Sequence, residues 1–218
     1  MSLASLAPGA SGIGAFTFST LPAGSLASSP TVVFNVSVSG TRVGQTNVPE
    51  NVTSSVTKTA KVATAVTLSS YALHTSGSFA NSGPIPPKAN KATTYAIVWN
   101  ARDTGSAVAG GIVTATLPSY VSYTGQTSGA GTFSYNEKSR MVTWNTGDFA
   151  QGASAQGSFQ VSITPSTSQV GIAPPLVSLA SFSGHDRFAN VDISATADPA
   201  TTETKNDVGY VPENAIVQ

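Results

Sequence analysis

One stretch of this sequence occurs twice, and the repeat limits the folds that the chain can adopt. Leu6 to Pro22 reads LAPGASGIGAFTFSTLP, and Phe149 to Pro165, 143 residues later, reads FAQGASAQGSFQVSITP. Glycines, one phenylalanine and the final proline align without a gap. At an offset of 144, Val38-Ser39-Gly40 aligns with Phe182-Ser183-Gly184. A sequence that resembles itself at a fixed distance indicates similar structural units along one chain.

The side-chain pattern of the longer copy has a period of two, as in β-strands. Residues 93–100 (TTYAIVWN) place Tyr95, Ile97 and Trp99 on one face and Ala96 and Val98 on the other, and residues 158–164 (SFQVSIT) alternate between apolar and polar. Further strands are predicted at residues 61–68, 112–117, 121–124, 132–135, 140–144, 176–182 and 190–195. Residues 136–139 are predicted as a hairpin loop, and residues 73–92, which contain three prolines, as a long surface connection.

About eight or nine short strands separated by turn residues predict an all-β fold, a two-sheet antiparallel β-sandwich with Greek-key connections. Trp99 and Trp144 are expected in the core between the sheets, with a sugar-binding platform as the alternative. We interpret the chain as a fragment of an array of tandem repeats, preceded by a short leader, Met1-Ser2-Leu3. Residues 4–56 are predicted to be the C-terminal part of a preceding β-sandwich repeat, 57–200 a complete repeat, and 201–218 a C-terminal tail or linker. Residues 50–61 are predicted as a short linker.

Composition restricts the class of protein further. Ser and Thr account for 58 of the 218 residues, whereas charged residues are 9% of the chain and net charge is zero; a typical soluble domain has about 25% charged residues. The composition excludes a helical bundle, a coiled coil and a basic nucleic-acid binder. The chain has no cysteine and no uninterrupted apolar run long enough for a membrane span. From the hydroxyl-rich, charge-poor composition we expect an extracellular or cell-surface location.

The residues from 57 to 165 resemble a family of bacterial surface repeats, domain of unknown function 11. The resemblance lies in the strand from Tyr95 to Trp99, the turn at residues 103–106, Ile112, the strand end at Leu117-Pro118, and the closing motif formed by Trp144, Gly147 and Gly152-Ala153-Ser154. Leu6 to Ser11 is similar to part of that closing motif. This chain has Asp103 where the family usually has Asn, and Ala115 in place of an acidic residue.

The resemblance implies an Ig-like sandwich repeated along large bacterial cell-surface or secreted proteins, without a common active site. Our leading interpretation is a non-catalytic structural repeat, a spacer or stalk module whose partners are neighbouring repeats of the same chain. The unpaired strands of residues 1–56 are expected to dock on the complete domain or to form a homodimer. The alternative is an adhesive or carbohydrate-binding module that binds a cell-surface glycan or protein through exposed rings at Tyr120, Tyr123 and Tyr135.

One covalent modification is a further hypothesis. Surface sandwiches sometimes cross-link a lysine to an asparagine or aspartate, assisted by a buried carboxylate, because burial lowers the pKa of the lysine and makes it nucleophilic. Lys58 or Lys61 on the opening strand and Asn190 or Asp192 on the closing strand are the candidates. The alternative is that these are solvated surface residues.

No catalytic residue, metal site or cofactor is expected. Two histidines and no cysteine do not suffice for a typical zinc site, and the aspartates are spread too widely for a calcium loop. Ser183-Gly184-His185-Asp186 is predicted to form a hairpin turn and not a Ser-His-Asp triad, because a triad depends on geometry and not on adjacency. A glycosidase needs a pair of carboxylates that face each other across a cleft, and the sequence shows no obvious pair of this kind.

Overall fold

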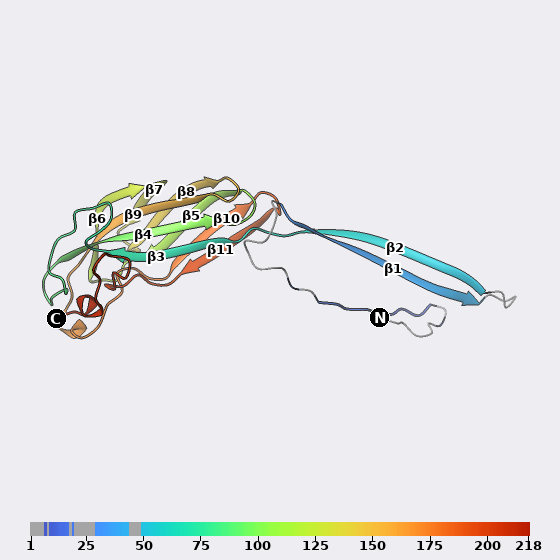
Figure 1. The fold of residues 1–218 in the computed structure, drawn as a ribbon, viewed down its shortest axis with the longest axis horizontal. Coiled ribbons are helices and arrows are strands. Elements are labelled where there is room, and N and C mark those ends of the chain that lie inside the picture. The colour runs from blue at the N-terminus through green and yellow to red at the C-terminus, as the bar shows by residue number, and fades with distance from the viewer. Residues whose placement is uncertain (1–6, 8, 18, 20–28, 44–48) are drawn as a thin grey trace.

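The computed structural model describes residues 7, 9–17, 19, 29–43 and 49–218. Within these residues the chain forms a two-layer β-sandwich and a long two-stranded hairpin that projects from one end of it (Figure 1). The hairpin consists of β1 (Thr31–Val43) and β2 (Pro49–Lys61), paired antiparallel from Thr31 opposite Lys61 to Val43 opposite Pro49.

The sandwich contains nine antiparallel strands in two sheets. One sheet has the order β3-β4-β9-β6 and the other has the order β11-β10-β5-β8-β7. Their bounds are β3 (Val66–Leu73), β4 (Thr93–Asp103), β5 (Val108–Thr116), β6 (Val121–Gly129), β7 (Thr132–Asn136), β8 (Met141–Phe149), β9 (Ser154–Ile163), β10 (Ala180–Asp186) and β11 (Val191–Ala197). Two short 3-10 helices follow: Thr167–Gln169 lies in the connection between β9 and β10, and Pro212–Ala215 lies in the segment after β11. Strands adjacent in a sheet are mostly not consecutive in the chain, because the chain crosses repeatedly between the layers. This confirms the predicted all-β antiparallel sandwich.

Aromatic side chains fill the space between the two sheets. Trp99 on β4 and Trp144 on β8 are fully buried with ring centroids 6.4 Å apart, and Phe133 stacks on Trp144. Each indole N–H has an acceptor: Trp99 donates to the Ser70 hydroxyl at 3.1 Å, and Trp144 donates to the Ala130 carbonyl at 2.7 Å. The predicted core position of both tryptophans is confirmed, and their burial excludes the alternative sugar-binding platform.

The Pro-rich connection, predicted at residues 73–92, begins one residue later because Leu73 ends β3. It contains no strand, and it covers the outer face of β4. Phe79 from this connection packs with Tyr71 against the buried side chains of Leu73, Ala96 and Val98. Strand β4 is consequently buried on both faces, in agreement with its run of five apolar residues from Tyr95 to Trp99.

The last residues of the chain pack on the sandwich instead of extending from it. Ala215 and Val217 are buried, and Gln218 exchanges backbone hydrogen bonds with the Pro-rich connection, donating to Pro87 and accepting from Ala89. The segment 201–218, predicted as a tail or linker, is thus a packed tail.

Three local predictions are wrong. The strand predicted at residues 61–68 is interrupted, because β2 ends at Lys61 and β3 begins only at Val66. Residues 50–61, predicted as a linker, belong to β2. Ser183 to Asp186, predicted as a hairpin turn, complete β10, and the turn follows at residues 187–190. Much of the first repeat copy, Leu6 to Pro22, lies outside the described residues, and the boundaries 4–56 and 57–200 remain predictions.

Candidate functional site at the base of the hairpin

The connection between β2 and β3, residues 62–65, attaches the hairpin to both sheets through Thr64. The Thr64 backbone N–H donates to the Asp186 carboxylate at 2.6 Å, and its hydroxyl donates to the Asp103 carboxylate at 2.5 Å. Asp103 ends β4 in one sheet, and Asp186 ends β10 in the other. Thr104 adds two hydrogen bonds, from its N–H and its hydroxyl, to the Ala65 carbonyl. We call this arrangement the Thr64 joint.

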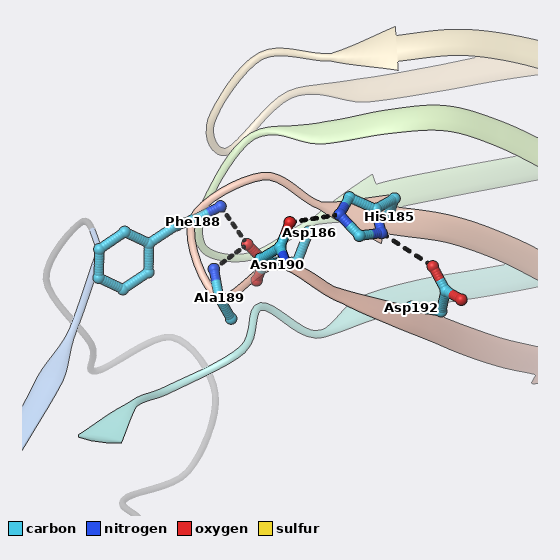
Figure 2. A network of polar contacts seen from close by, with 6 residues as sticks. All are labelled: His185, Asp186, Phe188, Ala189, Asn190 and Asp192. Atoms are coloured by element: carbon cyan, nitrogen blue, oxygen red, sulfur yellow. Dashed lines mark hydrogen bonds and ion pairs between the residues drawn. The ribbon is translucent and has the colours of Figure 1, made fainter. Parts of the chain in front are cut away.

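Asp186 is completely buried, and every partner recorded for its carboxylate is a backbone N–H. Besides Thr64, it accepts from Phe188 at 2.7 Å and from Ala189 at 2.9 Å, both in the following turn (Figure 2). Burial by itself would raise the pKa of Asp186, but the hydrogen bonds from Thr64, Ala189 and Phe188, together with the nearby charge of His185, hold the pKa below its usual value. The ionised carboxylate therefore fixes both the turn and the joint.

The contacts of Asp103 give a structural role to Gly152, which is part of the closing motif noted in the sequence. One of its carboxylate oxygens accepts from the Thr64 hydroxyl and the Gly105 N–H, and the other accepts from the Gly152 N–H at 2.8 Å. An asparagine has one acceptor oxygen in its side chain, so the aspartate at this position can bind the β8–β9 turn and Thr64 together. The sequence showed the departure from the family pattern but not this consequence.

Lys61 ends β2 beside the turn that follows β10. Its ammonium group donates to the Phe188 carbonyl at 2.8 Å and lies 4.9 Å from the centroid of the Phe188 ring. The structure therefore brings Lys61 to the turn that contains Asn190, but with its amine bound to a carbonyl. Lys58 lies farther out on the hairpin, opposite Phe34, and is exposed.

The other two cross-link candidates are engaged with His185 on the outer face of the hairpin β10–β11. Asp192 lies 2.8 Å from His185 Nδ1, and Asn190 lies 3.4 Å from His185 Nε2 (Figure 2). The hydrogen bond to Asp192, followed by the one to Asn190, raises the pKa of His185. Asp186 is buried and bound to backbone N–H groups, so its carboxylate is not available to the His185 ring as a triad would require. The cross-link itself stays a hypothesis.

The three candidate binding tyrosines are half-buried and pack against the core. Tyr123 on β6 and Tyr135 on β7 stack across one open edge of the sandwich, with centroids 4.9 Å apart, and Tyr123 also contacts Phe159. The Tyr120 hydroxyl donates to the Pro175 carbonyl at 3.1 Å. Burial raises the pKa of Tyr120 and of Tyr123. These contacts account for the rings as packing between the edge strands, and ligand binding by them stays a prediction.

A third buried carboxylate, Asp207, fastens the C-terminal tail. It accepts from the backbone N–H groups of His74, Thr75 and Ser76 at 2.6–3.1 Å, and from the Ser76 hydroxyl. Burial would raise the pKa of Asp207, but these hydrogen bonds hold it below its usual value. The His74 ring packs edge-on against Tyr95, where burial lowers the pKa of the histidine and raises that of the tyrosine. No sequence pattern predicted that Asp207 holds the C-terminal tail.

The described residues contain neither a metal-binding cluster nor a membrane-spanning helix. No three His, Asp or Glu side chains in this part of the chain come together as a metal site would require. None of its helices is long and apolar enough to cross a membrane.

No protein-family model matches the sequence, so the resemblance to domain of unknown function 11 stays a prediction. No curated protein matches it significantly.

Solved structures with a similar arrangement include bacterial pilins. A variant of BcpA, the major pilin subunit of Bacillus cereus, has a TM-score of 0.43 at 13% identity, over 75% of this chain and 47% of that one. The major pilin SpaD of Corynebacterium diphtheriae has a TM-score of 0.40 at 11% identity, over 62% and 34%. A GH20 exo-β-N-acetylglucosaminidase of Vibrio harveyi, with a TM-score of 0.36 at 10% identity, is matched over 62% and 18%. The chain thus spans half or less of each of these proteins, and the similarity is too low to argue a function.

Proposed function

We propose that the chain is a non-catalytic structural repeat, a spacer or stalk module of a large bacterial cell-surface or secreted protein, with neighbouring repeats as its partners. The observation that supports this most directly is the Thr64 joint. A spacer transmits orientation only if consecutive elements cannot swivel, and here two buried carboxylates from opposite sheets hold one threonine. The hydroxyl-rich surface with few charges suits a location outside the cell.

The adhesive alternative has less support. Stacking on a sugar needs a free aromatic face, whereas Tyr123 and Tyr135 stack on each other and Tyr120 is fastened to Pro175.

A distance measurement across the joint tests the spacer proposal. The chain has no cysteine, so Ser55→Cys on the hairpin and Ser122→Cys on β6 introduce two unique spin labels. We expect pulsed electron paramagnetic resonance to give one narrow distance distribution. Thr64→Gly should broaden it, and Asp192→Ala, which removes an exposed carboxylate outside the joint, should not. A broad distribution in the otherwise unchanged chain would show a hinge and contradict a stiff spacer.

A further inference from the structure

The C-terminal tail, residues 201–218, closes over a histidine whose ring has no polar partner. His74 is the first residue of the Pro-rich connection, and both of its ring nitrogens are buried without a hydrogen bond among the described residues. The ring packs edge-on against Tyr95 with centroids 5.5 Å apart, and the Tyr95 hydroxyl is also buried without a partner there. Buried polar groups are nearly always hydrogen-bonded, so this pair is an unfavourable setting for any added charge.

The tail supplies most of the wall beside His74. A cavity of about 30 Å³ lies next to the histidine, lined by His74 and Ile85 from the Pro-rich connection and by Asp207, Gly209 and Tyr210 from the tail, among others. This volume has room for about two water molecules, which gives protons a route to the histidine while the tail is docked. Release of the tail would open this wall and expose the ring to bulk water.

Asp207 is the charge that acts on the His74 ring. Burial lowers the pKa of His74 more than the Asp207 charge raises it, so the docked ring is neutral at neutral pH. The Ser82 backbone also raises the pKa, but it makes no hydrogen bond of normal geometry to the ring. A protonated His74 is therefore less compatible with the docked tail than a neutral one.

His74 is the side chain in this cluster that titrates between neutral and mildly acidic pH. Tyr95 and Tyr210 lie against the ring and its cavity, and a tyrosine loses its proton only near about pH 10. The carboxylate of Asp207 has a lowered pKa and stays ionised in this range. Glu203 and Lys205, also on the tail, pair with each other at 2.6 Å.

We propose that His74 is the sensor of an acid-sensitive latch, in which protonation of its ring releases the C-terminal tail from the sandwich. The ordinary pKa of a solvated histidine is about 6.5, and the pKa of the docked ring is lower. The neutral ring therefore contributes fully to docking above about pH 6.5, and this contribution is lost as the pH falls from there through the lower docked value. The latch lies at the end of the sandwich opposite to the projecting hairpin (Figure 1), so it opens away from the Thr64 joint.

The tail has few buried apolar contacts to hold it once His74 is charged. Ala215 and Val217 are its buried apolar side chains. The backbone N–H groups of Val217 and Gln218 donate to Ile172 and Pro87. Segments with few buried apolar contacts open locally at a lower free energy than the core. One unfavourable charge can therefore shift the docking equilibrium and leave the two sheets intact.

Hydrogen exchange followed by nuclear magnetic resonance tests the proposal. Protection of the Val217 and Gln218 amides, corrected for the intrinsic pH dependence of exchange, reports docking of the tail. We expect this protection to fall from about pH 8 to about pH 5, the range in which histidine changes charge. The amides of β9, which lies between β4 and β6 in its sheet, should stay protected over the same range.

Two matched variants identify the sensor. His74→Phe keeps an aromatic ring against Tyr95 but cannot be protonated, and it should abolish the pH dependence at both tail amides. His185→Phe makes the same substitution at the other histidine of the chain, on β10, and should leave the pH dependence as it is in the unchanged chain. Far-ultraviolet circular dichroism checks that each variant is folded, and His74→Gln replaces His74→Phe if the latter does not fold.

Three outcomes overturn the proposal. Protection of the tail that does not change with pH shows that protonation does not release it. A loss of protection that persists in the His74 variant shows that another group is the sensor. A loss that extends to β9 shows that acid unfolds the whole domain and not the tail alone.

Discussion

Removing the Asp186 carboxylate should destabilise the protein more than removing any exposed carboxylate. The side chain is fully buried and accepts hydrogen bonds from the N–H groups of Thr64, Phe188 and Ala189. Asp186→Ala leaves three backbone donors without this acceptor. The change therefore tests whether the carboxylate holds the joint.

The burial of each donor sets the magnitude. Thr64 is buried, so loss of its charge-assisted hydrogen bond costs about 1.5–3 kcal/mol. Phe188 and Ala189 lie in a half-exposed turn where water can replace the carboxylate, at a cost of about 0.5–1 kcal/mol each. Removing a buried charge returns part of its desolvation cost. We expect a net loss of about 2–4 kcal/mol in the free energy of unfolding.

Urea unfolding at neutral pH, followed by the fluorescence of the buried tryptophans, measures this loss. Asp192→Ala is the control, since that side chain is 93% exposed, and it should change stability by less than about 0.5 kcal/mol. If Asp186→Ala were as stable as the control, the carboxylate would not hold the joint, and our account of the hairpin's attachment would be refuted.

Three further predictions concern the C-terminal tail, the pH dependence of stability and the cross-link. Asp207→Ala should release the C-terminal tail, seen as faster hydrogen exchange at Val217 and Gln218, whereas the exposed Asp198→Ala should not; unchanged exchange would show that other contacts hold the tail. Because the pKa values of Asp186 and Asp207 are lowered in the folded state, their stabilisation is complete above the unfolded value of about 3.9 and is lost as pH falls through the lower folded values. Urea titrations between neutral and acidic pH should show this loss, and a smaller one in Asp186→Ala; equal slopes would argue against Asp186 as a source. Intact-mass measurement should give the full calculated mass, since the Lys61 amine binds the Phe188 carbonyl, and a mass lower by one ammonia would instead demonstrate a lysine–asparagine cross-link.

Alternation along the chain was sufficient to predict the strands of the sandwich. Side chains on one face of a strand recur every second residue. A short stretch of sequence, such as residues 93–100 or 158–164, therefore suffices to predict a buried face. The tryptophans were placed correctly for the same reason. Strand β2 was missed because its sequence is rich in Thr, Ser and Lys, and its strand conformation comes from pairing with β1, not from a pattern of its own.

The joint depended on contacts that no local pattern contains. Thr64 meets Asp103 and Asp186, which lie 39 and 122 residues away in the chain, and Asp186 itself was assigned to a turn. A carboxylate looks the same in sequence whether it is solvated or buried against backbone N–H groups. The sequence alone determined the fold class, because hydrophobic burial follows local periodicity. Only the tertiary structure decided which aspartates are buried and what they hold, because both depend on how distant strands are brought together.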